Sequence, residues 1–338
     1  MVDESIMKQK SRVQWLNLGD SNTTFYHACM KNRQARNNIG KLIDSNGDIV
    51  QNTEEVKAKI LNFYRGLLGS SATQLPMINC NIMKNDNVLN MSQQLQLISP
   101  VSNEEVKQAL LGIDDNKAPM RDGYNSYFFK KTWNIVGEEI TATVQDFFES
   151  ADMCKAINCT TITLIPNIQN PTNIRDFKLI SCCTVLYKLI SKVITTRMQE
   201  VMDRLVDNCQ AAFVLGKLIT DNILMSHELV KGYGRKSISP RCMLKIDMQK
   251  AYDSVEWMYI EQVLRSLNFP EIFVRWIMAC ISTMIYSVLI NGRPTDPFEA
   301  KKGLRQGDPL SHFLFVLAME YLSRSFVTTQ NPTSRDDT

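Results

Sequence analysis

The chain has 338 residues, of which 44% are hydrophobic and 22% are charged, a balance that excludes wholesale disorder and allows a sizeable core. The 38 Lys and Arg residues nearly balance the 35 Asp and Glu residues, so the net charge of +3 gives no argument for a nucleic acid, a membrane or an acidic partner. The first 42 residues are more basic, with seven Lys and Arg against three Asp and Glu.

The nine cysteines are scattered, odd in number and without a Cys-x-x-Cys pair, and the chain has only three histidines. This pattern favours reduced thiols that act as small buried hydrophobes, and neither a disulfide framework nor a zinc site. The first 30 residues lack the apolar segment of a signal peptide. The most apolar stretch, 276–290, is too short to cross a bilayer. We expect it to be buried core, with no membrane partner and a location in the nucleus or the cytosol.

In chain order, residues 1–50 are polar and predict an irregular or partly helical leader. Residues 54–68 have a helical period, whereas 69–99 are rich in Asn and Gln, weakly patterned and typical of a linker. We therefore expect two regions, a basic helical or irregular leader with its linker over 1–100 and a second unit over 101–338.

Ser102 followed by Glu105 predicts a capping box that opens a helix through Leu111. Periodicity predicts three further helices and one strand. The helices cover 138–148, 185–205 and 219–231, and the strand covers 161–165.

The pattern over 243–248 predicts a strand that ends near Asp247, followed by a helix over 255–267. A second strand over 286–290 closes at Asn291-Gly292, a pair suited to a tight turn, with a possible return strand at 297–298. Asp308 before Pro309 predicts a helix start, with the helix continuing to residue 321. This mixed order of strands and helices indicates an α+β or α/β fold.

Asp247 is the strongest candidate for chemistry, because a carboxylate at the end of a strand can hold Mg²⁺ against substrate phosphates. A capping carboxylate without a catalytic role is the more frequent meaning of a single Asp. Asp253 is interpreted as a cap or an ion-pair partner and not as a ligand. His312 has no partner that can be assigned by spacing.

Two loops could contact a nucleotide or its phosphates. The segment 303–309 (GLRQGDP) combines two glycines with a helix start and could present N–H groups and Gln306, although a plain helix-entry turn fits equally well. The segment 117–123 (KAPMRDG) places Lys117 and Arg121 in a turn that suits a phosphate backbone, but an ordinary solvated loop is the commoner case.

A third candidate lies in the leader, where basic residues are close in sequence to Phe25 and Tyr26. Charge combined with aromatic stacking is typical of single-strand binding, and a solvated polar face is the alternative. The basic residues are Lys31, Arg33 and Arg36.

Taken together, these segments resemble the reverse transcriptases of plant non-LTR (LINE-type) retrotransposons over nearly the whole chain. Residues 15–27 (WLNLGDSNTTFYH) are similar to a stretch upstream of the polymerase in these elements, and residues 117–123 to their Lys-Ala-Pro-Gly-Pro-Asp-Gly. Residues 247–253 (DMQKAYD) resemble polymerase motif A, and 303–311 (GLRQGDPLS) resemble motif B. Three further segments resemble the fingers and the region after them: 164–167 (LIPN), 176–181 (DFKLIS) and 210–217 (QAAFVLGK).

The resemblance implies an α+β fold, the fingers and part of the palm of a right-handed polymerase, and primer extension with deoxynucleoside triphosphates on an RNA template and a DNA primer. It implies that Asp247, with the Met248 carbonyl, binds Mg²⁺. Tyr252 would be the gate against a ribose 2′-hydroxyl, and Gln306 and Gly307 would line the nucleotide pocket beside Arg305. Lys178 would contact the triphosphate.

The sequence departs from the family at several positions. Asn167 stands where Lys is usual, Lys178-Leu179 where Arg-Pro is usual, and His312 where Pro is usual. These changes weaken triphosphate neutralisation, because Asn has no charge and Lys lacks the fork of Arg. The Ala-Asp-Asp of motif C does not occur before Thr338, and Asp336-Asp337 follows no apolar strand.

The sequence therefore predicts a reverse transcriptase domain that is truncated before motif C, without a thumb and inactive alone. A non-catalytic remnant that binds RNA or an RNA/DNA duplex is the first alternative. A gene fragment that does not fold, because its palm sheet would keep an open edge, is the second.

Overall fold

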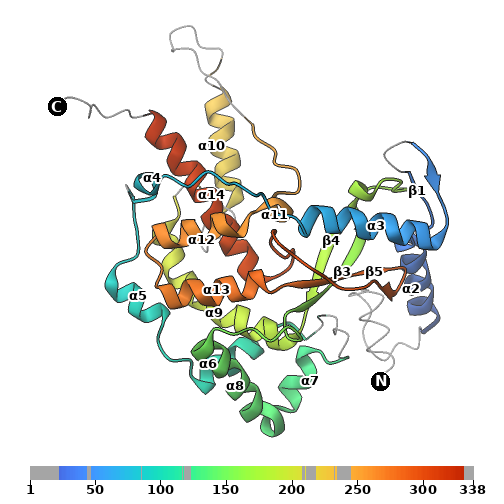
Figure 1. Ribbon diagram of the computed structural model, residues 1–338, viewed down its shortest axis with the longest axis horizontal. Coiled ribbons are helices and arrows are strands. Elements are labelled where there is room, and N and C mark those ends of the chain that lie inside the picture. Colours follow the sequence, from blue (N-terminus) through green and yellow to red (C-terminus); the bar gives the residue numbers. More distant parts are fainter. Residues whose placement is uncertain are drawn as a thin grey trace.

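The computed structural model describes residues 23–43, 47–84, 86–115, 117, 123–207, 210, 218–231, 233 and 245–330, and the fold is mixed α+β (Figure 1). Most of the predicted loop 117–123, including Arg121, and nearly all of the segment 210–217 lie outside the described residues. The same holds for Asp336 and Asp337.

The main sheet has five strands in the order β4-β3-β5-β6, with β7 also paired to β5. Strand β3 runs antiparallel to β4 and parallel to β5. A parallel pair needs a crossover connection, and here the chain between β3 and β5 supplies a long one that contains several helices. The strands are β3 (Cys159–Pro166), β4 (Phe177–Cys183), β5 (Ile285–Ile290), β6 (Arg293–Pro294) and β7 (Phe298–Glu299).

Helix α9 (Val185–Leu205) is central to the helical part and is buried over most of its surface. It packs against α14 (Pro309–Gln330), α6 (Asn103–Leu111), α5 (Met91–Leu97) and α8 (Trp133–Ser150). A helix that is surrounded in this way needs apolar residues on more than one face, and α9 has them at Leu189, Ile190 and Val193.

Helix α12 (Trp257–Ser266) packs between α13 (Glu271–Ser282) and α14. The stretch 276–290 belongs largely to α13 and β5, and its Trp276, Ile277 and Val288 are buried, so the expectation of buried core is confirmed. No helix in the described part of the chain is both long and apolar enough to cross a membrane.

The N-terminal region packs on elements that come much later in the sequence. Helix α2 (Thr23–Asn37) lies against β3, and α3 (Thr53–Leu68) lies against α11 (Ala251–Ser254). The short strands β1 (Leu42–Ile43) and β2 (Ile49–Val50) pair with each other between these helices. The predicted linker 69–99 contains α4 (Cys80–Lys84) and α5, which pack on α14 and α9 through buried residues such as Met83 and Leu97.

Most of the predicted elements are present. The structure confirms the helices predicted over 54–68, 185–205 and 219–231, the last of these being α10 (Ile219–Lys231). The helix predicted over 138–148 is the longer α8, and α7 (Ser126–Lys131) precedes it. Asn291 and Gly292 both have positive φ and form the predicted turn between β5 and β6.

Three expectations are corrected. Residues 245–248 form no strand and are exposed, because a strand needs a hydrogen-bonded neighbour and none of the described strands pairs with this segment. The side chain of Ser102 does cap α6, but that of Glu105 binds Arg197 at 2.7 Å, so the reciprocal half of the capping box is not formed. Cys80 and Cys154 are exposed thiols, whereas Cys183 and Cys280 are buried as expected.

Candidate functional site

The loop 303–308 is held on one side by the segment that follows Asp247. The backbone N–H of Gly303 donates to the Val255 carbonyl, and that of Leu304 donates to the Tyr252 carbonyl, both at 2.8 Å. Trp257 adds a third bond, since its indole N–H donates to the Gly303 carbonyl. The segments that resemble motifs A and B are thereby joined through their backbones.

On its other side the same loop meets the edge strand β4. The N–H of Ser181 donates to the Gln306 carbonyl at 3.1 Å. Gly307 has φ of +100°, and Gly303 has φ of +90°. A Cβ atom added to Gly303 would lie only 3.1 Å from a methyl carbon of Leu68. Glycine is therefore required at 303 by both conformation and close packing, and at 307 by conformation.

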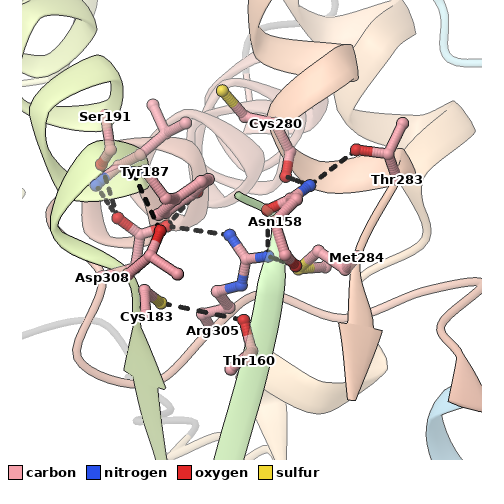
Figure 2. A network of polar contacts seen from close by, with 12 residues as sticks. Asn158, Thr160, Cys183, Tyr187, Ser191, Cys280, Thr283, Met284, Arg305 and Asp308 are labelled. Atoms are coloured by element: carbon pink, nitrogen blue, oxygen red, sulfur yellow. Dashed lines mark hydrogen bonds and ion pairs between the residues drawn. The ribbon is translucent and has the colours of Figure 1, made fainter. Parts of the chain in front are cut away.

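Asp308 starts α14 and also crosslinks it to α9 (Figure 2). One carboxylate oxygen accepts from the Leu310 N–H at 3.2 Å and from the Ser191 hydroxyl at 2.6 Å. The other accepts from the Tyr187 hydroxyl at 2.5 Å, and burial raises the pKa of Tyr187, which keeps this donor protonated. The predicted N-cap is confirmed, and it carries a tertiary role that the sequence did not reveal.

Arg305 lies inside the protein, with only 1% of its surface exposed. One of its terminal nitrogens donates to the backbone carbonyl of Asn158 at 3.1 Å and to the side-chain oxygen of the same residue. The guanidinium lies 4.1 Å from the ring centre of Tyr187, and its other terminal nitrogen is 4.0 Å from Asp308 (Figure 2). The expectation that Arg305 lies beside a nucleotide is therefore corrected, because its side chain is committed to the core.

Tyr252 is half-buried, and its ring is held by two residues of α14. Its hydroxyl lies 2.9 Å from Nδ1 of His312, and its ring stacks on Phe315 with centres 4.6 Å apart and planes 14° apart. Burial raises the pKa of Tyr252 and lowers that of His312, the latter against an opposing effect of Asp308. Sequence spacing offered no partner for His312, and the fold supplies one from 60 residues away.

Asp247 is exposed in the irregular segment before α11, and the neighbouring Met248 lines an apolar groove of about 760 Å³ together with Phe315 and Tyr259. Asp253, on α11, is buried, and burial raises its pKa to about 6 against the opposing attraction of Lys250. The interpretation of Asp253 as a cap or an ion-pair partner and not a ligand stays a prediction.

The described residues contain no cluster of three or more His, Cys, Asp or Glu side chains able to hold a metal ion. Lys178 is exposed on β4, opposite Ile165 of β3. In the loop 117–123, of which the structure describes Lys117 and Gly123, Lys117 is exposed. On α2, Lys31 and Arg36 are exposed and Arg33 is partly buried.

The fold agrees with the fingers and palm of a right-handed polymerase. It has a mixed sheet with packed helices, and the loop 303–308 is hydrogen-bonded both to Tyr252 and to β4. Residues 168–333 match the family described as Reverse transcriptase (RNA-dependent DNA polymerase). This match covers just under half of the chain, and the similar proteins described next come from a transposon and from R2 retrotransposable elements, which supports a reverse transcriptase domain in these residues.

Several curated proteins are similar to this chain. The "Transposon TX1 uncharacterized 149 kDa protein" of Xenopus laevis is 25% identical over 311 residues, which cover 92% of this chain and 24% of that protein. The "Retrovirus-related Pol polyprotein from type-1 retrotransposable element R2" of Nasonia vitripennis is 25% identical over 67% of this chain and 21% of its own length. The corresponding type-2 protein R2DM of Drosophila melanogaster is 28% identical over 48% of this chain and 15% of its own length. The chain thus spans a quarter or less of each of these relatives.

Proposed function

We propose that the chain is the fingers and an incomplete palm of an RNA-directed DNA polymerase of a plant-type LINE element, working on an RNA template, a DNA primer and deoxynucleoside triphosphates in the nucleus or the cytosol. In this proposal residues 101–338 are the polymerase part and residues 1–100 are a basic leader, whose described helices α2 to α5 pack against later elements. The 338 residues contain no Ala-Asp-Asp, and we propose that they are inactive alone.

The observation that carries the proposal is the placement of Gln306. Its backbone is fixed by β4, and its side-chain oxygen is buried without a hydrogen-bond partner among the residues that the structure describes. A buried acceptor without a donor is costly, and a bound nucleotide offers donors. Tyr252 lies on the neighbouring segment, where a ring could exclude a 2′-hydroxyl.

The residues fit a metal only in part. Asp247 and the Met248 carbonyl are oxygen ligands of the kind that Mg²⁺ prefers, and Asp247 is exposed to solvent. Bound Mg²⁺ would neutralise charge on the triphosphate, and Lys178 would contribute to the same task. Chemistry with two metal ions would need further carboxylates beside Asp247, which motif C supplies in the family.

Primer extension tests the inactivity of the chain. Homopolymer RNA with an annealed DNA primer, deoxynucleotide and Mg²⁺ or Mn²⁺ should give no extension with residues 1–338. Robust incorporation that disappears in Asp247→Ala would show that these residues assemble a working centre, and the inactivity proposal would be withdrawn.

Nucleotide binding tests the site itself. On the same primed template with Mn²⁺, we expect the chain to retain deoxynucleotide and Gln306→Ala to weaken binding about two- to tenfold, the range of one hydrogen bond. Gln108→Ala is the matched control, since Gln108 is exposed on α6 and its side chain donates to Glu104 in its own helix. Equal binding by wild type and Gln306→Ala would remove Gln306 from the pocket.

A second candidate function is non-catalytic binding of RNA or an RNA/DNA duplex. The exposed cations of α2 and the exposed Lys117 favour it, because phosphate contacts supply most of non-specific affinity. Affinity should fall steeply as salt rises, and absence of binding at low salt would exclude this function.

A further inference from the structure

A cavity of about 820 Å³ lies between the N-terminal region and the turn that connects β3 to β4. One wall is the end of α2 and the segment before β1, and the other is the turn that begins after Pro166. The polar side chains that line it are Asn32, Arg36, Asn38, Lys41, Gln169 and Asn170.

Both walls are fixed by hydrogen bonds to their backbones. The side-chain amide of Asn291, in the turn between β5 and β6, accepts from the Ile39 N–H at 2.8 Å and donates to the Ile39 carbonyl at 3.0 Å. The Ile43 N–H donates to the Thr172 carbonyl at 2.7 Å, which ties β1 to the opposite wall. The cavity is therefore part of the fold and not a gap beside a loose leader.

The chemistry of the lining suits a nucleotide. Four amide side chains present donors and acceptors together, which is what the edge of a nucleobase requires. Arg36 and Lys41 add positive charge at the rim, and both are exposed. Ile39, Pro166 and Phe177 supply apolar surface for a base or a sugar.

An RNA duplex does not fit this lining, because base edges are paired there and its major groove is closed to side chains. Unpaired bases can leave the strand and enter a cavity, and a volume of several hundred cubic ångströms is that of small-molecule sites. We infer that this cavity binds one or two nucleotides of single-stranded RNA, with Arg36 and Lys41 on phosphates and the amides on bases. The inference rests on the RNA binding proposed above and names its site.

The test is binding of a fluorescent 12-nucleotide single-stranded RNA of mixed sequence to residues 1–338, measured by anisotropy over a range of salt concentrations. Arg36→Gln should lower affinity and reduce the slope of log K against log salt by about 0.7, the value for one phosphate of a single strand. Asn170→Gly should lower affinity about two- to tenfold without changing the slope, because it removes an uncharged hydrogen-bonding group. Glycine suits that position, where φ is +52°.

Lys107→Gln on α6 is the matched control, since it removes one exposed charge far from the cavity in sequence and should leave the affinity nearly unchanged. Thermal unfolding of each variant shows that the fold is retained.

Wild-type binding with losses confined to the cavity variants supports the inference. Binding that is equal in wild type, Arg36→Gln and Asn170→Gly would overturn the cavity but leave RNA binding intact. Equal losses from Lys31→Gln and Arg36→Gln with none from Asn170→Gly would indicate a charged face of α2, and equal affinity for a blunt duplex would remove the single-strand claim. No RNA binding at low salt would overturn both the inference and the RNA-binding candidate.

Discussion

Replacing Asp253 by Asn is expected to stabilise the protein at neutral and alkaline pH. The Asp253 side chain is only 5% exposed, and burial raises its pKa from 3.8 to about 6 even though Lys250 attracts the charged form. The folded state therefore resists ionisation of this carboxyl group. Asn has nearly the same shape and carries no charge, so it removes that resistance.

The sign and the size follow from proton linkage. Between pH 3.8 and about 6 the folded state binds more protons at Asp253 than the unfolded state does, so this group lowers stability as pH rises through that window. A shift of about two pKa units corresponds to about 3 kcal/mol at pH 8, since each unit is worth about 1.4 kcal/mol. Below pH 4 the contribution vanishes, because the group is neutral in both states.

Urea unfolding of wild type and Asp253→Asn at pH 4, 6 and 8 measures this difference directly. We expect nearly equal free energies of unfolding at pH 4 and a gain of about 2 to 3 kcal/mol for the variant at pH 8. The exposed Asp146→Asn on α8 is a control that should show no such gain. A variant that is no more stable than wild type at pH 8, or equally stabilised at every pH, would refute the account of Asp253.

Three further changes probe the packing around the site. Arg305→Met should destabilise the chain by about 3 to 5 kcal/mol in urea unfolding, because a buried charge pair loses one partner, while Arg275→Met on the exposed face of α13 should change it by less than about 0.5 kcal/mol. Glu105→Gln should cost about 1.5 to 3 kcal/mol in the same assay, since it removes the charge that pairs with the buried Arg197. Wild type should lose stability relative to His312→Gln as pH falls below 6.5, because burial lowers the pKa of His312 and the unfolded state takes up the proton first. Free energies of unfolding that change with pH in parallel for the two proteins would contradict this.

The helices were predictable where local signals agree with the tertiary environment. The bounds of α9 and α10 follow from periodicity alone, and the start of α14 follows from Asp308-Pro309 because the cap and the restricted proline act within one turn. The turn at Asn291-Gly292 was likewise predictable, since both positions need positive φ.

The segment around Asp247 was not predictable, because alternation of side chains shows only that a strand is compatible with the sequence. Residues 245–248 lack a pairing neighbour among the described strands, and hydrogen bonding between strands is a property of the fold. The contact between Tyr252 and His312 was not predictable for a related reason, since it depends on how α14 lies against α11 and not on the spacing of the two residues in the sequence.

The loop 303–308 shows why a sequence motif does not assign the roles of its members. Arg305 and Asp308 are buried and bind Asn158, Tyr187 and Ser191, so both serve to anchor the loop. Between them, Gly307 is exposed, and Gln306 is partly buried with its side-chain oxygen covered. Since two buried charged anchors flank Gln306 and Gly307, loss of Arg305 should displace Gln306 indirectly, and a weakened site in Arg305→Met would be an effect of position and not of a lost contact to the ligand.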